Sequence, residues 1–139
     1  MKITSYRDLD AWRLSMDLVE AVYTMTKLLP REELFGLTMQ LRRAAVGIPS
    51  NVSEGHQHKG RAYRRYVVIA LGCQAECETQ LELVHRLKLA PARDVASVME
   101  LASRVGQVLH GLARSLKKKP TASDQDRRRD GTRTGKGEP

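Results

Sequence analysis

The stretch Gly36–Gly55, GLTMQLRRAAVGIPSNVSEG, decides the fold. Placed on a helix at 100° per residue, it separates into two opposed faces. The apolar face consists of Leu37, Leu41, Ala44, Ala45, Ile48 and Val52. The other face consists of Arg43, Gly47, Ser50, Asn51 and Glu54. A face that only meets solvent uses Lys and Glu freely, whereas this one combines small residues, an amide and single charges, which favours contact with another surface.

Pro49 lies inside this helical pattern. A proline within a helix removes one backbone donor and crowds the carbonyl of Ala45, at a cost of about 3 kcal/mol. Both faces keep their phase beyond the proline, so the pattern predicts a helix over residues 38–54 that is kinked at Pro49. The residues that follow, 55–60 (GHQHKG), are bracketed by glycines and predict a loop.

Three more segments have helical periodicity, and no segment indicates a strand. The first spans residues 8–29 and is stopped by Pro30. Another spans residues 61–89, and the last opens at Pro91. The short connection between these two predicts antiparallel neighbours. We therefore predict an all-α, up-and-down antiparallel four-helix bundle over residues 1–116.

The helix over residues 8–29 is apolar around well over half of its circumference. One stripe contains Leu9, Trp12, Met16, Val19 and Tyr23, and the adjoining stripe contains Ala11, Leu14, Leu18, Val22, Met25 and Leu29. A helix in a monomeric bundle needs an apolar stripe of only about 100°. The surplus predicts a second buried contact, with another subunit. The candidate residues of that oligomer interface are Trp12, Arg43, Gly47, Ser50, Asn51 and Glu54.

The formal net charge of the 139-residue chain is +8. Residues 117–139 hold eight Lys/Arg and four Asp/Glu, with no large apolar residue, and are predicted to form a disordered basic tail after the bundle domain. Excess positive charge favours an acidic partner, of which nucleic acid is the commonest. The alternative is that the charge only keeps the protein soluble.

The strongest candidate site is a cluster of basic side chains in which Glu54 is the single acid between residues 42 and 65. The candidate nucleic-acid-binding residues are Arg42, Arg43, Lys59, Arg61, Arg64 and Arg65, joined by Lys117, Lys118 and Lys119 of the tail. Three of these arginines open a helix, where positive charge is disfavoured by roughly 0.3–1 kcal/mol, so stability alone would place acids there. Tyr63 and Tyr66 alternate with them and could stack on bases.

An alternative explanation is that these arginines pair with acids of a neighbouring subunit. The acids available on the helix over residues 8–29 are Asp10, Asp17 and Glu20. In that case the two tyrosines would be ordinary core residues, and the positive charge would contribute to assembly rather than to nucleic-acid binding.

Catalytic and metal-binding motifs are weak. Cys73 and Cys77 lie four residues apart on one helix, too far for an unstrained disulfide, and no second Cys or His pair stands at zinc-like spacing. We interpret them as core residues in a reducing, cytoplasmic setting. His56, His58 and Glu54 could hold a metal ion, although a polar loop is the preferred interpretation. We expect no enzymatic activity, no metal or cofactor, and no membrane segment.

Several motifs resemble a family of four-helix-bundle proteins, named for proteins encoded in intervening sequences of 23S ribosomal RNA genes. The matching stretches are YRDLDAW (6–12), FGLT (35–38), QLRRAA (40–45), IPSN (48–51), EG (54–55), ALG (70–72) and ExETQL (76–81). The resemblance spans roughly residues 5–116. It implies a bundle that assembles into a ring, with five subunits expected. The family has no established catalytic residues, so Arg42, Arg43, Asn51 and Glu54 carry over only as a shared signature.

Two hypotheses of function follow. The first is a cytoplasmic, non-enzymatic oligomeric bundle that binds nucleic acid, with RNA favoured, through a basic surface. The second is a protein–protein scaffold without a direct nucleic-acid role. The fold resembles accessory proteins of diversity-generating retroelements, which implies a reverse transcriptase as one possible partner of such a scaffold.

Overall fold

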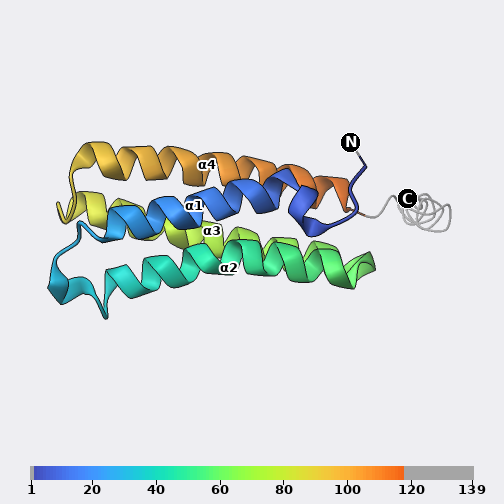
Figure 1. Cartoon of the computed structure of the whole chain (residues 1–139), viewed down its shortest axis with the longest axis horizontal. Coiled ribbons are helices and arrows are strands. Elements are labelled where there is room, and N and C mark those ends of the chain that lie inside the picture. The colour runs from blue at the N-terminus through green and yellow to red at the C-terminus, as the bar shows by residue number, and fades with distance from the viewer. Residues whose placement is uncertain (1, 118–139) are drawn as a thin grey trace, which may run out of the picture.

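A computed structural model of the chain describes residues 2–117. Its helices are α1 (Asp10–Thr26), α2 (Leu37–His58), α3 (Gly60–Arg86) and α4 (Ala92–Ser115), with short 3₁₀ helices η1 (Tyr6–Asp8) and η2 (Arg31–Glu33) before α1 and α2. The described residues contain no strand. The predicted up-and-down four-helix bundle is confirmed (Figure 1). The predicted basic tail lies outside the described residues apart from Lys117.

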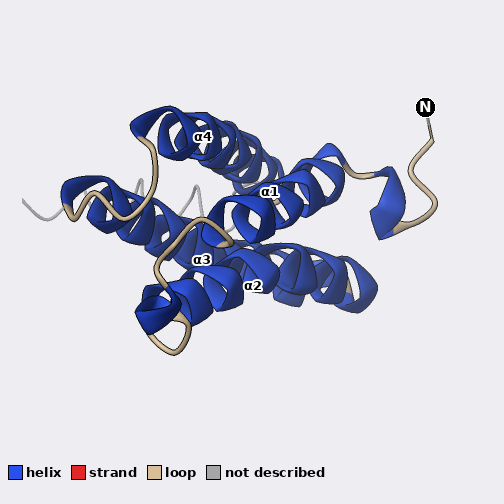
Figure 2. Cartoon of the chain, turned by 60° about the vertical axis from the view of Figure 1, so that its left-hand side comes forward, coloured by secondary structure: helices blue, strands red, loops and turns tan. Residues whose placement is uncertain are grey.

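The four helices close into a bundle in which α2 packs between α1 and α3, while α4 packs against α3 and α1 (Figure 2). Alternating direction brings η1, the α2–α3 turn and the last turn of α4 to one end, which we call the turn end (Figure 1). The segment with η2 and the α3–α4 connection form the opposite end, the loop end.

The core between the helices is aliphatic, and each helix contributes to it. Its largest fully buried side chains are Leu18 of α1, Leu41 and Ile48 of α2, Leu81 of α3 and Leu109 of α4. Burying a side chain of this size contributes about 1.5–3 kcal/mol, so these residues supply much of the driving force for folding. Polar residues are concentrated on the outer faces, as the periodicity predicts.

The first helix is shorter than the predicted range 8–29, because η1 precedes it and α1 ends at Thr26. The Ser5 hydroxyl accepts a hydrogen bond from the Arg7 N–H at 3.2 Å. The Asp8 carboxylate accepts from the N–H and hydroxyl of Thr4 and from the N–H of Ser5. These hydrogen bonds, those from Thr4 first, hold the pKa of Asp8 below its ordinary value.

The second helix is longer than predicted, and the predicted loop over residues 55–60 is wrong. Helix α2 continues to His58, and Lys59 alone separates it from α3. Gly55 is buried inside α2, where a Cβ atom would lie 2.7 Å from Cβ of Tyr66 and 3.1 Å from the carbonyl oxygen of Tyr63. This glycine therefore lets α2 and α3 approach closely. The chain reverses at Lys59 and Gly60, whose φ angles are 56° and 57°.

Pro49 lies inside α2 and does not end it, because the helix continues to His58. The Ser50 hydroxyl donates to the Val46 carbonyl at 2.8 Å, and Nδ2 of Asn51 donates to the Gly47 carbonyl at 2.7 Å. Side-chain bonds of this kind, to the carbonyl four residues earlier, are associated with bending of a helix, and they do not replace the donor that Pro49 lacks toward the Ala45 carbonyl.

Candidate nucleic-acid interface

The predicted basic residues of α2 and α3 fall into two separate groups. Arg42 and Arg43 lie in the first half of α2, whereas Lys59 follows its last turn. With a helical rise of 1.5 Å per residue, Arg43 and Lys59 are about 24 Å apart along the helix axis. The structure therefore does not bring all the candidate nucleic-acid-binding residues together.

Arg42 holds α2 against α1. Its Nε donates to Oγ1 of Thr26 at 2.8 Å, and its guanidinium lies 4.5 Å from the centroid of the Tyr23 ring. A cation over an aromatic face and a hydrogen bond to a buried hydroxyl both stabilise this position. Arg43 points outward from the bundle, is exposed, and makes no ion pair among the described residues.

The second group gathers at the turn end, and we call it the basic end. It comprises Lys59, Arg61, Arg64 and Arg65 around the α2–α3 turn, with Arg114 and Lys117 at the end of α4, all of them exposed. A hydrogen bond at 3.2 Å from Nε of Arg64 to the carbonyl of Ala113 joins the two helix ends. Carbonyls in the last turn of a helix lack a partner within it, so Arg64 also caps α4. Lys118 and Lys119 lie outside the described residues.

Few acids balance the positive charge of the basic end. The sequence has no acid between Glu54 and Glu76 and none between Glu100 and Asp124. Within residues 2–117, none of the six cations makes an ion pair. Arg61 and Arg65 also lie near the positive end of the α3 dipole. The result is an uncompensated positive surface suited to an anion.

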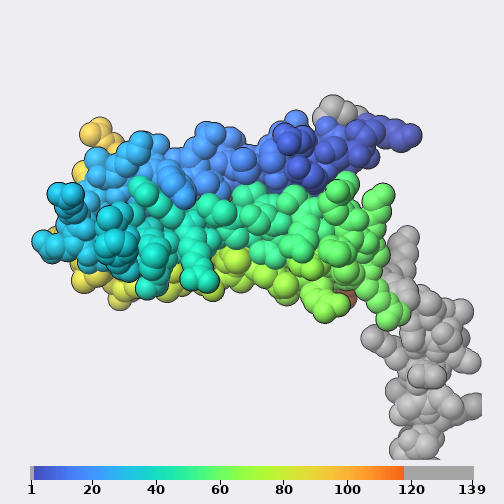
Figure 3. Space-filling model, turned by 60° about the horizontal axis from the view of Figure 1, so that its bottom comes forward, coloured from blue at the N-terminus to red at the C-terminus, as the bar shows by residue number. Residues whose placement is uncertain are grey.

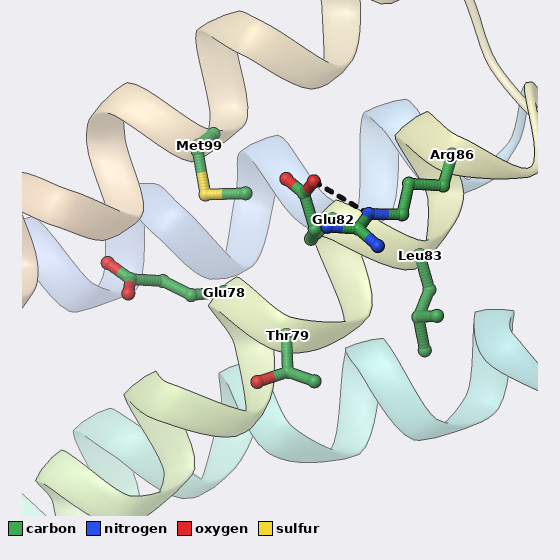
Figure 4. A pocket seen from close by; sticks show the side chains of 6 residues that line it. All are labelled: Glu78, Thr79, Glu82, Leu83, Arg86 and Met99. Carbon is green, nitrogen blue, oxygen red and sulfur yellow. Dashed lines mark hydrogen bonds and ion pairs between the residues drawn. The ribbon is translucent and has the colours of Figure 1, made fainter.

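The opposite half of α3 carries acids instead. Glu78 and Glu82 border a shallow hollow between α3 and α4, where Nε of Arg86 donates to Oε1 of Glu82 at 3.1 Å (Figure 4). Leu83 and Met99 give the same hollow an apolar part. Charge is therefore distributed unevenly along α3, with three of its four arginines at the turn end and its glutamates in the other half.

Two tyrosines lie among the cations, and the structure places them differently. Tyr63 is half-buried against the core, with its ring edge-on to His56 at 5.6 Å, and burial raises its pKa. Tyr66 is stacked on His58, with ring centroids 5.3 Å apart and planes at 8°. Both histidines belong to the last turn of α2 and pack on α3. Sequence reasoning missed these pairs because it placed the histidines in a loop.

The predicted oligomer interface also divides into two kinds of residue. Arg43, Ser50 and Glu54 are exposed on the outer face of α2. Gly47 has a role within the chain, because a Cβ atom there would lie 2.8 Å from Sγ of Cys73. Asn51 binds the Gly47 carbonyl, as described above.

Trp12, the other predicted interface residue, is half-buried at the start of α1. Its ring lies 5.5 Å from the ring of Tyr6, with the planes at 60°. The guanidinium of Arg7 lies 5.7 Å from the Trp12 ring centroid. Contacts from η1 thus cover part of this side chain within the chain.

Exposed apolar side chains gather on the face formed by α1, α2 and the segment that joins them, which is turned toward the viewer in Figure 3. We call it the α1–α2 face, and its exposed large apolar residues are Met16, Tyr23, Leu34, Phe35, Met39 and Val46. Phe35 is 82% exposed. The sequence predicts more apolar surface on the first helix than one bundle can bury, and part of that surface, at Met16 and Tyr23, is indeed exposed in the single chain. Other exposed apolar residues form two pairs, Val68 with Ile69 in the first half of α3 and Leu83 with Leu87 at its end, about 21 Å apart along the helix axis.

The cysteines contribute to packing. Cys77 is buried in the core, as expected, and Cys73 is half-buried against α2. Burial raises the pKa of Cys77 to about 12 and also raises that of Cys73. Within residues 2–117, no three His, Cys, Asp or Glu side chains are placed to hold a metal ion. A bilayer-spanning segment is likewise missing from these residues, because each helix is too short or too polar.

We predict that both thiols react slowly with a disulfide reagent such as DTNB at mildly alkaline pH, because the reactive thiolate is scarce. Cys77 should be protected most strongly, because it is buried and its pKa is about 12. Absorbance of the released thiolate should rise rapidly only after denaturation. Immediate reaction of both thiols in the folded protein would contradict this packing.

Comparison with known proteins identifies the family. Residues 7–111 match the family described as 23S rRNA-intervening sequence protein. The chain belongs to this family. The match covers α1 to α3 and most of α4, and it ends before the basic tail.

A crystal structure with a similar fold comes from a member of the S23 ribosomal protein family of Bacteroides thetaiotaomicron, described as a protein with unknown function. The two structures superpose with a TM-score of 0.69 at 22% sequence identity, over 75% of this chain and 95% of that chain. At this identity the likeness shows the fold alone. No curated protein matches this chain.

Proposed function

We propose that this member of the 23S rRNA-intervening sequence family is a non-enzymatic, oligomeric bundle that binds nucleic acid, RNA in preference, through its basic end. One observation supports this most strongly: the ends of two helices place six exposed cations together, and none of them is neutralised within residues 2–117. The description of the family, which refers to ribosomal RNA, favours RNA over DNA.

Such a site recognises the phosphate groups of a strand and not the sequence of its bases. Exposed Lys and Arg side chains bind phosphate oxygens and release condensed counterions, so affinity falls as salt rises. Arg61 and Arg65 are the central residues, because Arg64 already caps α4. Binding through phosphates alone positions a strand but distinguishes few sequences.

A salt titration of the full chain tests this function. Fluorescence anisotropy with a labelled single-stranded RNA should show a log–log slope of about −0.7 for each phosphate contacted. Several contacts are therefore expected to give a slope of roughly −3 or steeper. Absence of binding at low salt, or binding that does not change with salt, would refute the proposed function.

The oligomeric part of the proposal is based on the α1–α2 face. A patch of this kind marks an interaction site in a soluble protein. The occupant we propose is a second copy of this chain, which contributes exposed apolar side chains of α3. Two different faces on one chain produce head-to-tail contacts, and these close into a ring when the rotation allows it. A five-membered ring, as the family resemblance implies, is part of this proposal.

We predict that negative charge introduced into the α1–α2 face dissociates the oligomer into single chains. Replacing Phe35 and Met39 by glutamate should reduce the mass measured by light scattering to that of one chain, because two carboxylates would have to be buried. The matched control is Ser103→Glu on the exposed side of α4, which should retain the assembled mass. A wild-type protein that is already a folded single chain at micromolar concentration would contradict the assembly.

A further inference from the structure

The α2–α3 turn brings aromatic rings together beside the basic end. Because Lys59 alone separates the two helices, the last turn of α2 lies against the first turns of α3. Two ring pairs result, His56 with Tyr63 and His58 with Tyr66. These pairs differ in what they leave accessible.

In the inner pair, His56 with Tyr63, both rings are engaged in contacts within the chain. Tyr63 packs against the core, and both it and His56 are half-buried with their rings in edge-on contact. Nδ1 of His56 is buried without a hydrogen-bond partner. Neither ring offers an open face of the kind that a ligand ring could stack on.

In the outer pair, His58 with Tyr66, the imidazole remains partly open to solvent. The nearly parallel Tyr66 ring lies offset over one side of the His58 imidazole, and 55% of the His58 side chain is exposed. A planar ring that is covered on one side and still exposed to this extent has its other face in solvent. Tyr66 packs against the other side of the imidazole.

Cations that follow this ring closely along the chain suit a nucleotide. Lys59 follows His58 directly, and Arg61 and Arg65 lie on the first turns of α3. The nearest acid is Glu54, whose Oε1 lies 3.9 Å from Nε2 of His58 at the rim of the ring. Proteins bind single strands with a combination of exposed rings and flexible cations. The bases stack on the rings, and Lys and Arg side chains hold the phosphates.

We propose that the nucleic acid bound at the basic end is single-stranded, and that one base stacks on the open face of His58. Tyr66 supports the imidazole, while Lys59, Arg61 and Arg65 bind the flanking phosphates. A duplex keeps its bases stacked inside the helix and cannot offer one to this ring. This inference rests on the proposed function and adds the class of strand that the site accepts.

The test compares three probes on the full chain at one salt concentration: a single-stranded RNA, a strand of the same length without bases, and a duplex with the same number of phosphates. The wild type should bind the base-containing strand about tenfold more tightly than either of the others, since stacking of one base on an aromatic ring has an effect of this size.

Variants of His58 separate stacking from charge and from folding. His58→Ala should weaken binding of the base-containing strand about tenfold and leave the abasic strand unaffected. His58→Phe, which keeps a flat ring on Tyr66 without an ionisable group, should restore the preference. His85→Ala, an exposed histidine near the loop end, is the matched control and should bind as the wild type does.

The outcomes distinguish this inference from the proposed function. Equal affinity for all three probes, tighter binding of the duplex, or a His58→Ala effect of equal size on the abasic strand would overturn base stacking while leaving the basic end as a phosphate site. Failure of His58→Phe to restore the preference would also overturn it. If none of the three probes binds, the proposed function itself fails.

Discussion

Exchanging Arg61 and Arg65 for glutamate is expected to weaken RNA binding by roughly a hundredfold or more. Each arginine contributes charge-assisted hydrogen bonds to phosphate of about 1.5–3 kcal/mol, and the new carboxylates repel the strand. Both side chains are exposed and make no ion pair within residues 2–117, so the fold should tolerate the change. Anisotropy with labelled RNA measures the affinity, and circular dichroism verifies the helical content.

The matched control changes the same net charge at the other end of the bundle. Lys27 and Arg93 are exposed near the loop end, and replacing both by glutamate should reduce affinity only a few-fold, through the general field of the protein. If both double variants weaken binding equally, binding follows total charge and not the basic end. If the Arg61/Arg65 variant instead dissociates the assembly, these arginines contact a neighbouring subunit, as the scaffold hypothesis requires.

Replacing Gly55 by alanine is expected to lower the free energy of unfolding by about 1–3 kcal/mol, because the added methyl group overfills a close helix contact. Its Cβ would lie 2.7 Å from Cβ of Tyr66 and 3.1 Å from the Tyr63 carbonyl oxygen. These atoms are fixed by the α3 backbone, so the helices must separate. Urea denaturation at constant protein concentration measures the change.

Gly72→Ala is the matched control, with the opposite sign expected. Gly72 lies in the middle of α3, and a Cβ atom there would meet nothing within 4 Å. Alanine should therefore stabilise the helix by up to about 1 kcal/mol, the difference in helix propensity. Changes of the same sign and size at both glycines would show that α2 and α3 leave room for a methyl group at Gly55.

The helical periodicity of the sequence predicts the fold well. The glycines at positions 55 and 60, however, lead to a wrong boundary between the second and third helices. Four amphipathic segments and their short connections suffice for an antiparallel bundle. Gly55 looks like the start of a loop because a sequence does not show that Tyr66 lies against it. The apolar excess on the first helix, in contrast, is readable from the pattern alone, and Met16 and Tyr23 remain exposed on α1.

The candidate site is only partly predictable, because its grouping depends on contacts between distant residues. Arg42 and Arg43 are near Lys59 in sequence but about 24 Å from it along the helix. Arg64 caps α4 through Ala113, a contact that spans much of the chain. Arg114, which belongs to the basic end, is separated from the α3 arginines by a complete helical hairpin. Composition shows positive charge, but only the packing shows where it gathers.

Hydrogen exchange with and without a single-stranded RNA tests most directly whether the basic end is the nucleic-acid interface. Bound RNA should slow exchange of backbone amides around the α2–α3 turn, residues 56–66, and at the end of α4, residues 110–117. Residues 27–34 and 86–94 at the loop end should exchange as in the free protein. Protection confined to the loop end, or no protection despite saturating RNA, would contradict the account.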